Sequence, residues 1–194
     1  MKSLQNRTVW IVVALMSLMA LTRFNHFGSS AMLPDASYAV FFLGGLFLGR
    51  LRNGFAMLTL LLVEAAMVDY FATTFLGVSA WCVTPAYGFL AFSYASLWYV
   101  ARWYAPHHDL SAQGLLALFA AAIAASSLAF VIANVSFYML AGYFGNMSAS
   151  EYSTRVAAYY GSYIEVALLY IGFGVIAQMV YALVTGKRHD ANAV

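Results

Sequence analysis

Six apolar runs of helical length follow one another along this chain, and they constrain its fold more than any other feature of the sequence. About 20 consecutive apolar residues cross a bilayer as an α-helix. We therefore predict an all-α membrane protein with six transmembrane helices. The six runs are roughly Thr8–Thr22, Ala36–Leu51, Gly54–Phe75, Pro85–Tyr104, Gln113–Leu140 and Val156–Thr185.

The low proportion of charged residues agrees with this prediction. Of the 194 residues, 64% are hydrophobic and 8% are charged, whereas soluble globular proteins are roughly a quarter charged. So few charges cannot cover a folded surface, which excludes a soluble enzyme. The formal net charge of +2 provides no basic patch for nucleic acid. The length predicts a single transmembrane domain over residues 1–194.

The positive charges predict how the helices are oriented. With six spans, Arg23 and Arg155 fall on one side of the membrane, and the other seven of the nine Lys and Arg residues fall on the opposite side. By the positive-inside rule, both termini are then cytoplasmic. The first run is followed by Leu21-Thr22-Arg23 and not by a small-residue cleavage site, so we expect it to be retained.

No motif for nucleotide hydrolysis or proteolysis occurs in the sequence. The Gly186-Lys187 pair lacks the other residues of a phosphate-binding loop, because Tyr181 stands where the first glycine is needed and Arg188 where Ser or Thr is needed. The chain therefore carries no ATPase of its own. The remaining possibilities are a small carrier, a binding protein, or a helical bundle that supports a partner protein.

Cys82 is the only cysteine, so no intrachain disulfide is possible. It precedes Pro85, a residue that suits the first turn of a helix. Cys82 would then lie just before a helix N-terminus, where the partial positive charge favours a thiolate, and a bound metal would complete deprotonation. The alternative is an inert buried thiol that packs as a small hydrophobe, which is the commoner state of such a cysteine.

Three further side chains fall on the same outer side as Cys82. Asp69 lies toward the outer end of the third run, where we expect it to contact a ligand. Tyr87 follows Cys82 in the sequence. His26 follows the first run, and it fits either an interfacial loop or a metal ligand, since imidazole is a common ligand.

Tyrosines are concentrated in the sixth run. Tyr152, Tyr159, Tyr163 and Tyr170 are separated by seven, four and seven residues, which places them on one stripe of a helix. Flat apolar rings with hydroxyls suit a large ligand fringed with amides. Core packing is the alternative for each of them. We expect the ligand pocket to open on the outer side, beneath the Cys82 loop and a polar loop over residues 145–155.

Two other features have both a functional and a structural interpretation. Glu64 and Glu165 lie at membrane depth, where a carboxyl group marks a pathway or ties helices together. Gly45 and Gly49 form a Gly-x-x-x-Gly face, and residues 117–129 are rich in alanine. Small residues let helices approach closely, either within one bundle or against another membrane protein.

The segment Trp81-Cys82-Val83-Thr84-Pro85, with Asp69 before it and Tyr87 after it, resembles the BtuM family of solitary cobalamin transporters. The resemblance covers the whole chain, including its size and six-helix topology. It implies an S-component-like bundle, as in energy-coupling-factor transporters, in the bacterial inner membrane. It also implies that Cys82 coordinates the cobalt of cobalamin and is needed to remove cyanide from cyanocobalamin.

The resemblance defines the expected ligand and partners. The ligand is a corrinoid bound from the outer side, the surroundings are a lipid bilayer, and an external thiol reductant supplies electrons because one cysteine cannot form an internal disulfide. We expect a monomer that acts primarily as a transporter, with decyanation as an accompanying activity. The candidate ligand-binding residues are Cys82, Asp69, Tyr87, His26, Tyr159 and Tyr163, with Cys82 and His26 as candidate ligands of cobalt.

The first helix departs from the pattern of general S-components. Their first helix usually bears an Ala-x-x-x-Ala face for a coupling subunit, whereas here Ala14 is followed four residues later by Leu18, and Ala20 is preceded by Met16. Docking onto a shared coupling module is therefore not predicted. Two alternatives remain: a binding protein of the S-component type for another vitamin, with Cys82 as filler, or a structural or assembly protein without a small-molecule ligand.

Overall fold

The computed structural model describes residues 2–23 and 33–186, which form six α-helices and three short 3-10 helices and contain no strand. The prediction of an all-α chain is confirmed. The α-helices are α1 (Lys2–Arg23), α2 (Ser37–Leu48), α3 (Gly54–Phe75), α4 (Leu90–Tyr104), α5 (Ala112–Leu140) and α6 (Ala149–Thr185). The 3-10 helices are η1 (Ala80–Cys82), η2 (Pro85–Phe89) and η3 (Ala105–His107).

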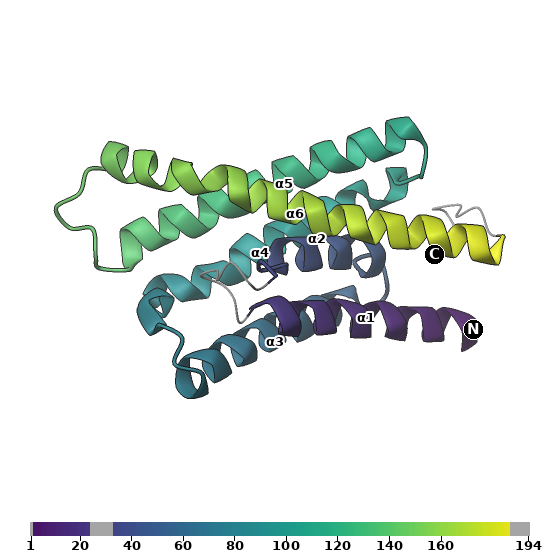
Figure 1. Cartoon of the computed structure of the whole chain (residues 1–194), viewed down its shortest axis with the longest axis horizontal. Coiled ribbons are helices and arrows are strands. Elements are labelled where there is room, and N and C mark those ends of the chain that lie inside the picture. The colour runs from purple at the N-terminus through teal and green to yellow at the C-terminus, as the bar shows by residue number, and fades with distance from the viewer. Residues whose placement is uncertain (1, 24–32, 187–194) are drawn as a thin grey trace.

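Consecutive α-helices run in opposite directions, so the bundle has two distinct ends (Figure 1). One end carries η1, η2 and the turn over residues 141–148, and we call it the thiol end. The opposite end carries the start of α1, the turn over residues 49–53, η3 and the end of α6, and we call it the basic end.

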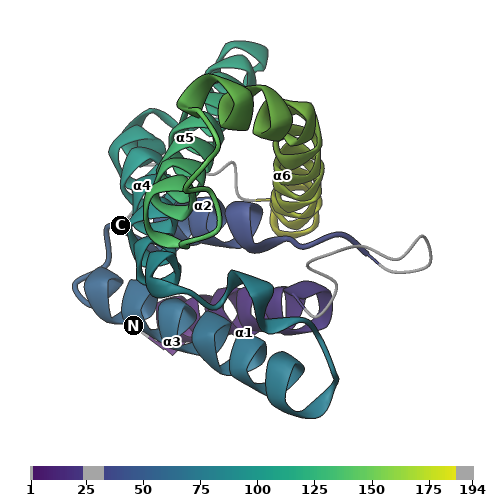
Figure 2. The ribbon, with the colours of Figure 1, turned by 90° about the vertical axis from the view of Figure 1, so that its left-hand side faces the viewer.

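Helix α2 occupies the centre of the bundle, with α1 and α3 on one side and α4, α5 and α6 on the other (Figure 2). Ten of its 12 residues are buried. A helix of this length rises only about 18 Å, which is shorter than the ~30 Å hydrocarbon core of a bilayer. Its apolar sequence therefore reflects burial within protein on all sides.

Glycines let α2 lie directly against α4. A Cβ atom on Gly45 would overlap the carbonyl oxygen of Trp98, and one on Gly44 would come within 2.6 Å of the Trp98 ring. The close approach of the two backbones therefore requires glycine at Gly45. Of the two interpretations of the Gly-x-x-x-Gly face, packing within the bundle is confirmed.

The alanine-rich part of α5 also packs internally. Ala122, Ala125 and Ala129 are fully buried, and the Ser93 hydroxyl of α4 donates a hydrogen bond of 2.8 Å to the carbonyl oxygen of Ala129. Both small-residue faces thus join helices of this chain to one another.

The start of α6 corrects the predicted outer loop over residues 145–155, because the helix begins at Ala149. The Ser148 side chain caps the helix by accepting a hydrogen bond of 3.2 Å from the Glu151 N–H. Glu151 in turn pairs with Arg155 one helical turn later, at 2.7 Å. A cap and an i,i+4 ion pair together extend the helix beyond the apolar run.

Three helices, α3, α5 and α6, are long and apolar enough to cross a membrane among the residues that the structure describes. Many of their large hydrophobic side chains are exposed, including Phe71, Leu116 and Phe173. Exposed apolar surface on this scale suits a lipid environment, because soluble monomers rarely expose large contiguous apolar patches.

Candidate functional site

A buried arginine organises the polar side chains at the thiol end. Arg23, the last residue of α1, is only 2% exposed. Its Nε and Nη2 atoms each donate a hydrogen bond of 2.7 Å to one oxygen of the Asp69 carboxylate on α3. Its Nη1 atom donates to the hydroxyls of Ser37 on α2, at 2.7 Å, and Tyr94 on α4, at 2.8 Å. One guanidinium therefore joins four helices.

Two more side chains complete this network. The Tyr87 hydroxyl of η2 donates a hydrogen bond of 2.6 Å to Asp69 Oδ2. Asp35, just before α2, accepts a hydrogen bond of 2.6 Å from the Ser37 hydroxyl and lies 4.0 Å from Arg23 Nη1. The structure thus brings Asp69 and Tyr87 together, as the sequence predicted, and places Arg23 beside them.

Cys82 is the last residue of η1, and its side chain is partly buried. Burial raises the pKa of the thiol, and the nearby negative charge of Asp69 raises it further. Both effects oppose the thiolate that the sequence leads us to expect beside a helix N-terminus. As the sequence predicts, Pro85 lies in the first turn of a helix. The helix η2 follows its N-cap Thr84 and continues directly into α4 at Leu90, so Cys82 lies three residues before a helix start.

The four tyrosines of α6 share one stripe but have different surroundings. Tyr152 and Tyr170 are buried, and the Tyr170 hydroxyl donates to the carbonyl oxygen of Pro34 at 2.8 Å. Between them, Tyr159 is 64% exposed and Tyr163 is 42% exposed. Core packing is confirmed for Tyr152 and Tyr170, the first and last of the four. Tyr159 and Tyr163, which lie between them along the helix, present accessible rings and hydroxyls.

Tyr163 connects the exposed part of this stripe to the rest of the thiol end. Its ring lies 5.4 Å from that of Tyr38 on α2 and 5.5 Å from that of Phe130 on α5. The Cys82 thiol lies close enough to interact electrostatically with its hydroxyl. Asp69 and Tyr163, two of the predicted ligand-binding residues, are thus both within electrostatic range of Cys82.

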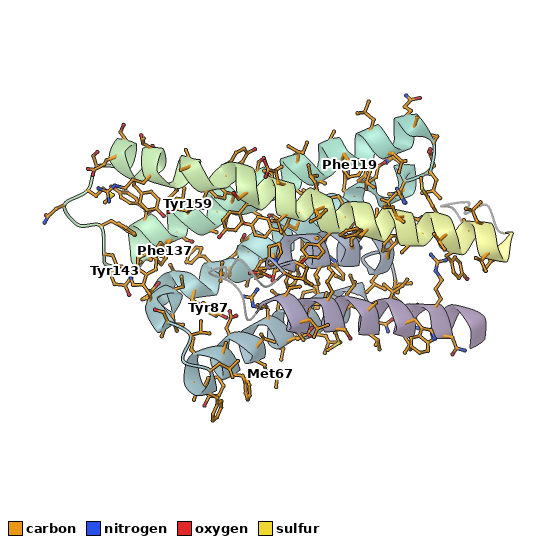
Figure 3. All side chains as sticks on the ribbon, in the orientation of Figure 1. Met67, Tyr87, Phe119, Phe137, Tyr143 and Tyr159 are labelled. Carbon is orange, nitrogen blue, oxygen red and sulfur yellow. The ribbon has the colours of Figure 1, made fainter. Side chains whose placement is uncertain are left out.

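An aromatic cluster holds the Cys82 loop against the turn between α5 and α6. The Trp81 ring stacks on that of Tyr143 at 5.2 Å and meets Phe137 edge-on at 4.9 Å. The Tyr143 hydroxyl donates to the Trp81 carbonyl oxygen at 3.2 Å. Tyr87, Phe137, Tyr143 and Tyr159 all project at the thiol end (Figure 3). The loop beside Cys82 is thus fixed by packing.

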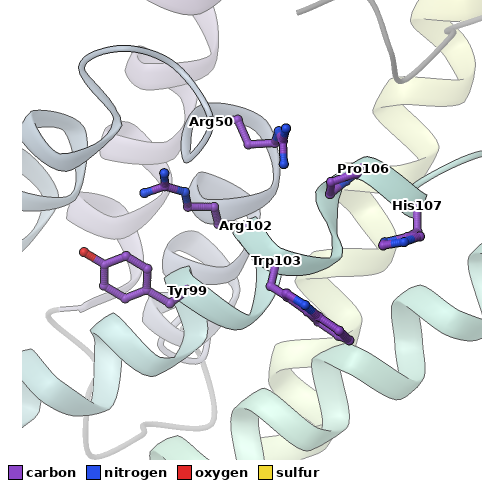
Figure 4. A pocket seen from close by; sticks show the side chains of 6 residues that line it. All are labelled: Arg50, Tyr99, Arg102, Trp103, Pro106 and His107. Carbon is purple, nitrogen blue, oxygen red and sulfur yellow. The ribbon is translucent and has the colours of Figure 1, made fainter.

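Open recesses occur at both ends of the bundle. One of about 460 Å³ lies at the thiol end, against the turn that contains Gly142, Tyr143 and Asn146. The other, of about 470 Å³, lies at the basic end and is lined by Arg50, Tyr99, Arg102, Trp103, Pro106 and His107 (Figure 4). The first recess is on the side where the sequence predicts the ligand pocket, but Cys82 and the other described candidate ligand-binding residues do not line it.

The remaining candidates differ in what the structure says of them. His26 lies outside the described residues, so its proposed ligand role stays a prediction. Glu64 has one carboxyl oxygen that is buried and makes no hydrogen bond within the described chain, whereas Glu165 is exposed on α6. No cluster of three or more His, Cys, Asp and Glu side chains suited to a metal ion occurs in the described part.

Sequence reasoning missed the role of Arg23 by counting it only as a charge on the outer side. Two signals pointed to a partner for it. Arg23 opposes the positive-inside bias, and Asp69 is a carboxylate in a membrane-length apolar run, where a charge requires a counterpart. The ion pair between Arg23 and Asp69 explains why each charge occurs in an apolar part of the sequence.

No protein-family model matches the chain. No curated protein matches it in sequence either. Its function is therefore inferred from the thiol end itself.

Proposed function

We propose that this chain is a multi-pass protein of the bacterial inner membrane that captures a corrinoid from the outer side, with Cys82 as an axial ligand of cobalt. The observation that carries the proposal is the exposed middle part of the tyrosine stripe on α6. Tyr159 and Tyr163 are left accessible between two buried tyrosines, and Cys82 lies within electrostatic range of Tyr163 and of Asp69. A soft sulfur donor, aromatic faces and polar hydroxyls suit a corrin with its fringe of amides.

In this proposal all six helices lie in the bilayer and both termini are cytoplasmic. The start of α1 and the end of α6 lie at the basic end, together with Arg50, Arg52 and Arg102 (Figure 1). This segregation of cations supports a cytoplasmic basic end under the positive-inside rule. The short α2 is compatible with a membrane location because protein surrounds it. At its start, the Ala36 N–H donates to the Thr22 hydroxyl at 3.1 Å and the Ser37 N–H donates to Asp35 at 2.9 Å.

The raised thiol pKa sets how Cys82 would act. The free thiol is neutral at physiological pH, and coordination to cobalt displaces its proton, since the thiolate is the form that binds metal. The cobalt–cyanide bond would break with both electrons leaving on cyanide, which takes up the displaced proton as hydrogen cyanide. Two external thiols would then be oxidised to a disulfide with loss of two protons, and would supply one electron to each of two cobalt centres. Asp69, Tyr87, Tyr159 and Tyr163 contact the corrin, and His26 remains a candidate second ligand.

The deciding experiment follows the visible spectrum of cyanocobalamin mixed with the purified protein and a thiol reductant. Cys82→Ser removes the sulfur donor and replaces it with a hard hydroxyl that binds cobalt weakly. We expect the spectral shift of decyanation to disappear while thermal unfolding is unchanged, because the lone cysteine holds no disulfide. A shift as fast as that of the wild type would eliminate Cys82 as the ligand, and His26→Ala would then be tested in the same assay.

A second candidate function is a binding protein of the same architecture for another small molecule, with Cys82 as a neutral packed thiol. The raised pKa of the free thiol favours this alternative. The variant Cys82→Ala separates the two, since it preserves a small apolar side chain. Unchanged binding of a ligand other than a corrinoid by Cys82→Ala would support the second candidate.

A further inference from the structure

The recess at the basic end is built by two separate segments of the chain. Arg50 comes from the turn between α2 and α3, whereas Tyr99, Arg102 and Trp103 come from the last turns of α4. Figure 4 shows Arg50, Arg102 and the Tyr99 ring to one side of Pro106 and His107, with the Trp103 indole below them. The recess is open to its surroundings and has a volume of about 470 Å³.

The two arginines are available to a ligand from outside the chain. Neither Arg50 nor Arg102 makes an ion pair or side-chain hydrogen bond with the described residues, and no carboxylate lines the recess. By contrast, the neighbouring His108 is buried and bonds to Gln178 at 2.9 Å. Two guanidinium groups that line one recess and have no partner among the described residues favour an anion with several oxygen acceptors, such as a phosphate group.

The aromatic lining indicates which kind of phosphate fits. Trp103 is 72% exposed and Tyr99 is 46% exposed, at the end of α4 where an aromatic belt meets the headgroup level of a bilayer. The Trp103 and Tyr99 rings would add no binding energy for a free inorganic ion. A phospholipid could pack its glycerol and upper acyl chains against these rings while its phosphate binds the two arginines.

We propose that this recess binds the headgroup of an anionic phospholipid from the leaflet at the basic end. Basic recesses between helices on the cytoplasmic side of a membrane protein are suited to such headgroups. The inference rests on the membrane location of the chain and does not depend on the ligand at the thiol end. The bound lipid would link the α2–α3 turn to α4, which are the two segments that supply the arginines.

The test measures the affinity of the full-length protein in neutral detergent for a short-chain phosphatidylglycerol. Phosphatidylcholine and inorganic phosphate are titrated in parallel. Each arginine near a membrane surface contributes about fivefold in affinity, so the double variant Arg50→Gln/Arg102→Gln should bind phosphatidylglycerol about 30-fold more weakly. Wild-type protein should prefer phosphatidylglycerol to phosphatidylcholine, and millimolar phosphate should not displace the lipid.

Arg52→Gln is the matched control, because Arg52 is an exposed arginine of the same turn that does not line the recess. Its affinity should stay within about twofold of the wild type if the recess and not the general surface charge binds the lipid. Arg102→Lys keeps the charge and checks that the fold tolerates substitution there. Three results would each overturn the proposal: equal affinity for the two lipids, an equal loss in Arg52→Gln, or displacement of the lipid by phosphate.

Discussion

The two ends of the bundle use arginine in opposite ways. At the thiol end, Arg23 is buried, and every nitrogen of its guanidinium donates a hydrogen bond to a side chain of this protein. At the basic end, Arg50 and Arg102 line an open recess and have no carboxylate partner among the described residues. The same side chain is a structural connector at one end and an accessible cation at the other.

The difference shows which charges hold the fold together and which remain for partners. A bidentate arginine–carboxylate pair removed from water is costly to break, because the remaining charge stays buried without compensation. An exposed arginine loses little when it is replaced, since water solvates it in either case. Asp69 is therefore already hydrogen-bonded to Arg23 and Tyr87. A ligand at the thiol end would contact these three side chains in an arrangement that exists before binding.

The largest expected effect compares one substitution at the two ends. Arg23→Gln leaves the Asp69 carboxylate without its bidentate partner, and we expect a loss of about 3–5 kcal/mol in the free energy of unfolding. Arg102→Gln should change it by less than about 0.5 kcal/mol, as for most exposed sites. Equilibrium unfolding in mixed micelles measures both.

Equal losses in Arg23→Gln and Arg102→Gln would show that the two arginines do not differ as the structure indicates. A second variant strengthens the test. Arg23→Met/Asp69→Leu removes both charges, and it should be more stable than Arg23→Gln because no unpaired charge remains buried.

How well the sequence predicted the helix bounds depends on the kind of interaction that sets each end. Apolar runs predicted six transmembrane helices. Six α-helices form in the described residues, and three of them are long and apolar enough to cross a membrane. The bounds expected for Gly54–Phe75 match those of α3, because a helix in an apolar environment depends on local composition. The start of α6 was missed because a cap and an ion pair, Ser148 and Glu151–Arg155, extend it through polar residues. Local polar chemistry, not hydropathy, decides such an end.

The candidate site was less predictable, because its contacts are far apart in sequence. Asp69 and Tyr87 were expected on one side of the membrane, which topology alone provides. The bond between Arg23 and Asp69 joins residues 46 positions apart, and no periodicity reports such a pairing. The pKa of Cys82 was expected to fall, whereas burial and the Asp69 charge raise it, because the sequence shows neither the depth of burial nor how close Asp69 lies to the thiol.

A smaller effect is expected from two tyrosines, one at each end. Tyr87→Phe removes a hydrogen bond of 2.6 Å to the Asp69 carboxylate. Because Arg23 still satisfies Asp69, we expect a loss of about 1 kcal/mol in the free energy of unfolding. Tyr99→Phe removes a hydroxyl that makes no hydrogen bond within the described chain, and it should change the free energy by less than about 0.5 kcal/mol. A greater loss in the free energy of unfolding for Tyr99→Phe than for Tyr87→Phe would contradict this prediction.

The smallest expected effect is a shift in the titration of the Cys82 thiol. The rate of alkylation by iodoacetamide follows the thiolate fraction, and burial together with the Asp69 charge raises the thiol pKa. The midpoint of the rate profile in the ligand-free protein should therefore lie above the ordinary cysteine value of about 8.5. Asp69→Asn removes a negative charge that disfavours the thiolate, and it leaves the positive Arg23 uncompensated. Both changes lower the pKa, so the profile should move to lower pH.

Two control variants make this last measurement specific. Asp69→Glu keeps the negative charge, so its profile should stay closer to that of the wild type than the profile of Asp69→Asn. Glu151→Gln removes an exposed carboxylate that does not act on the thiol, and it should leave the midpoint where it is. Circular dichroism at the assay temperature confirms that each variant remains folded. A midpoint that stays fixed or rises in folded Asp69→Asn would mean that Asp69 does not control the charge on Cys82, and the electrostatic link between the buried network and the proposed cobalt ligand would be wrong.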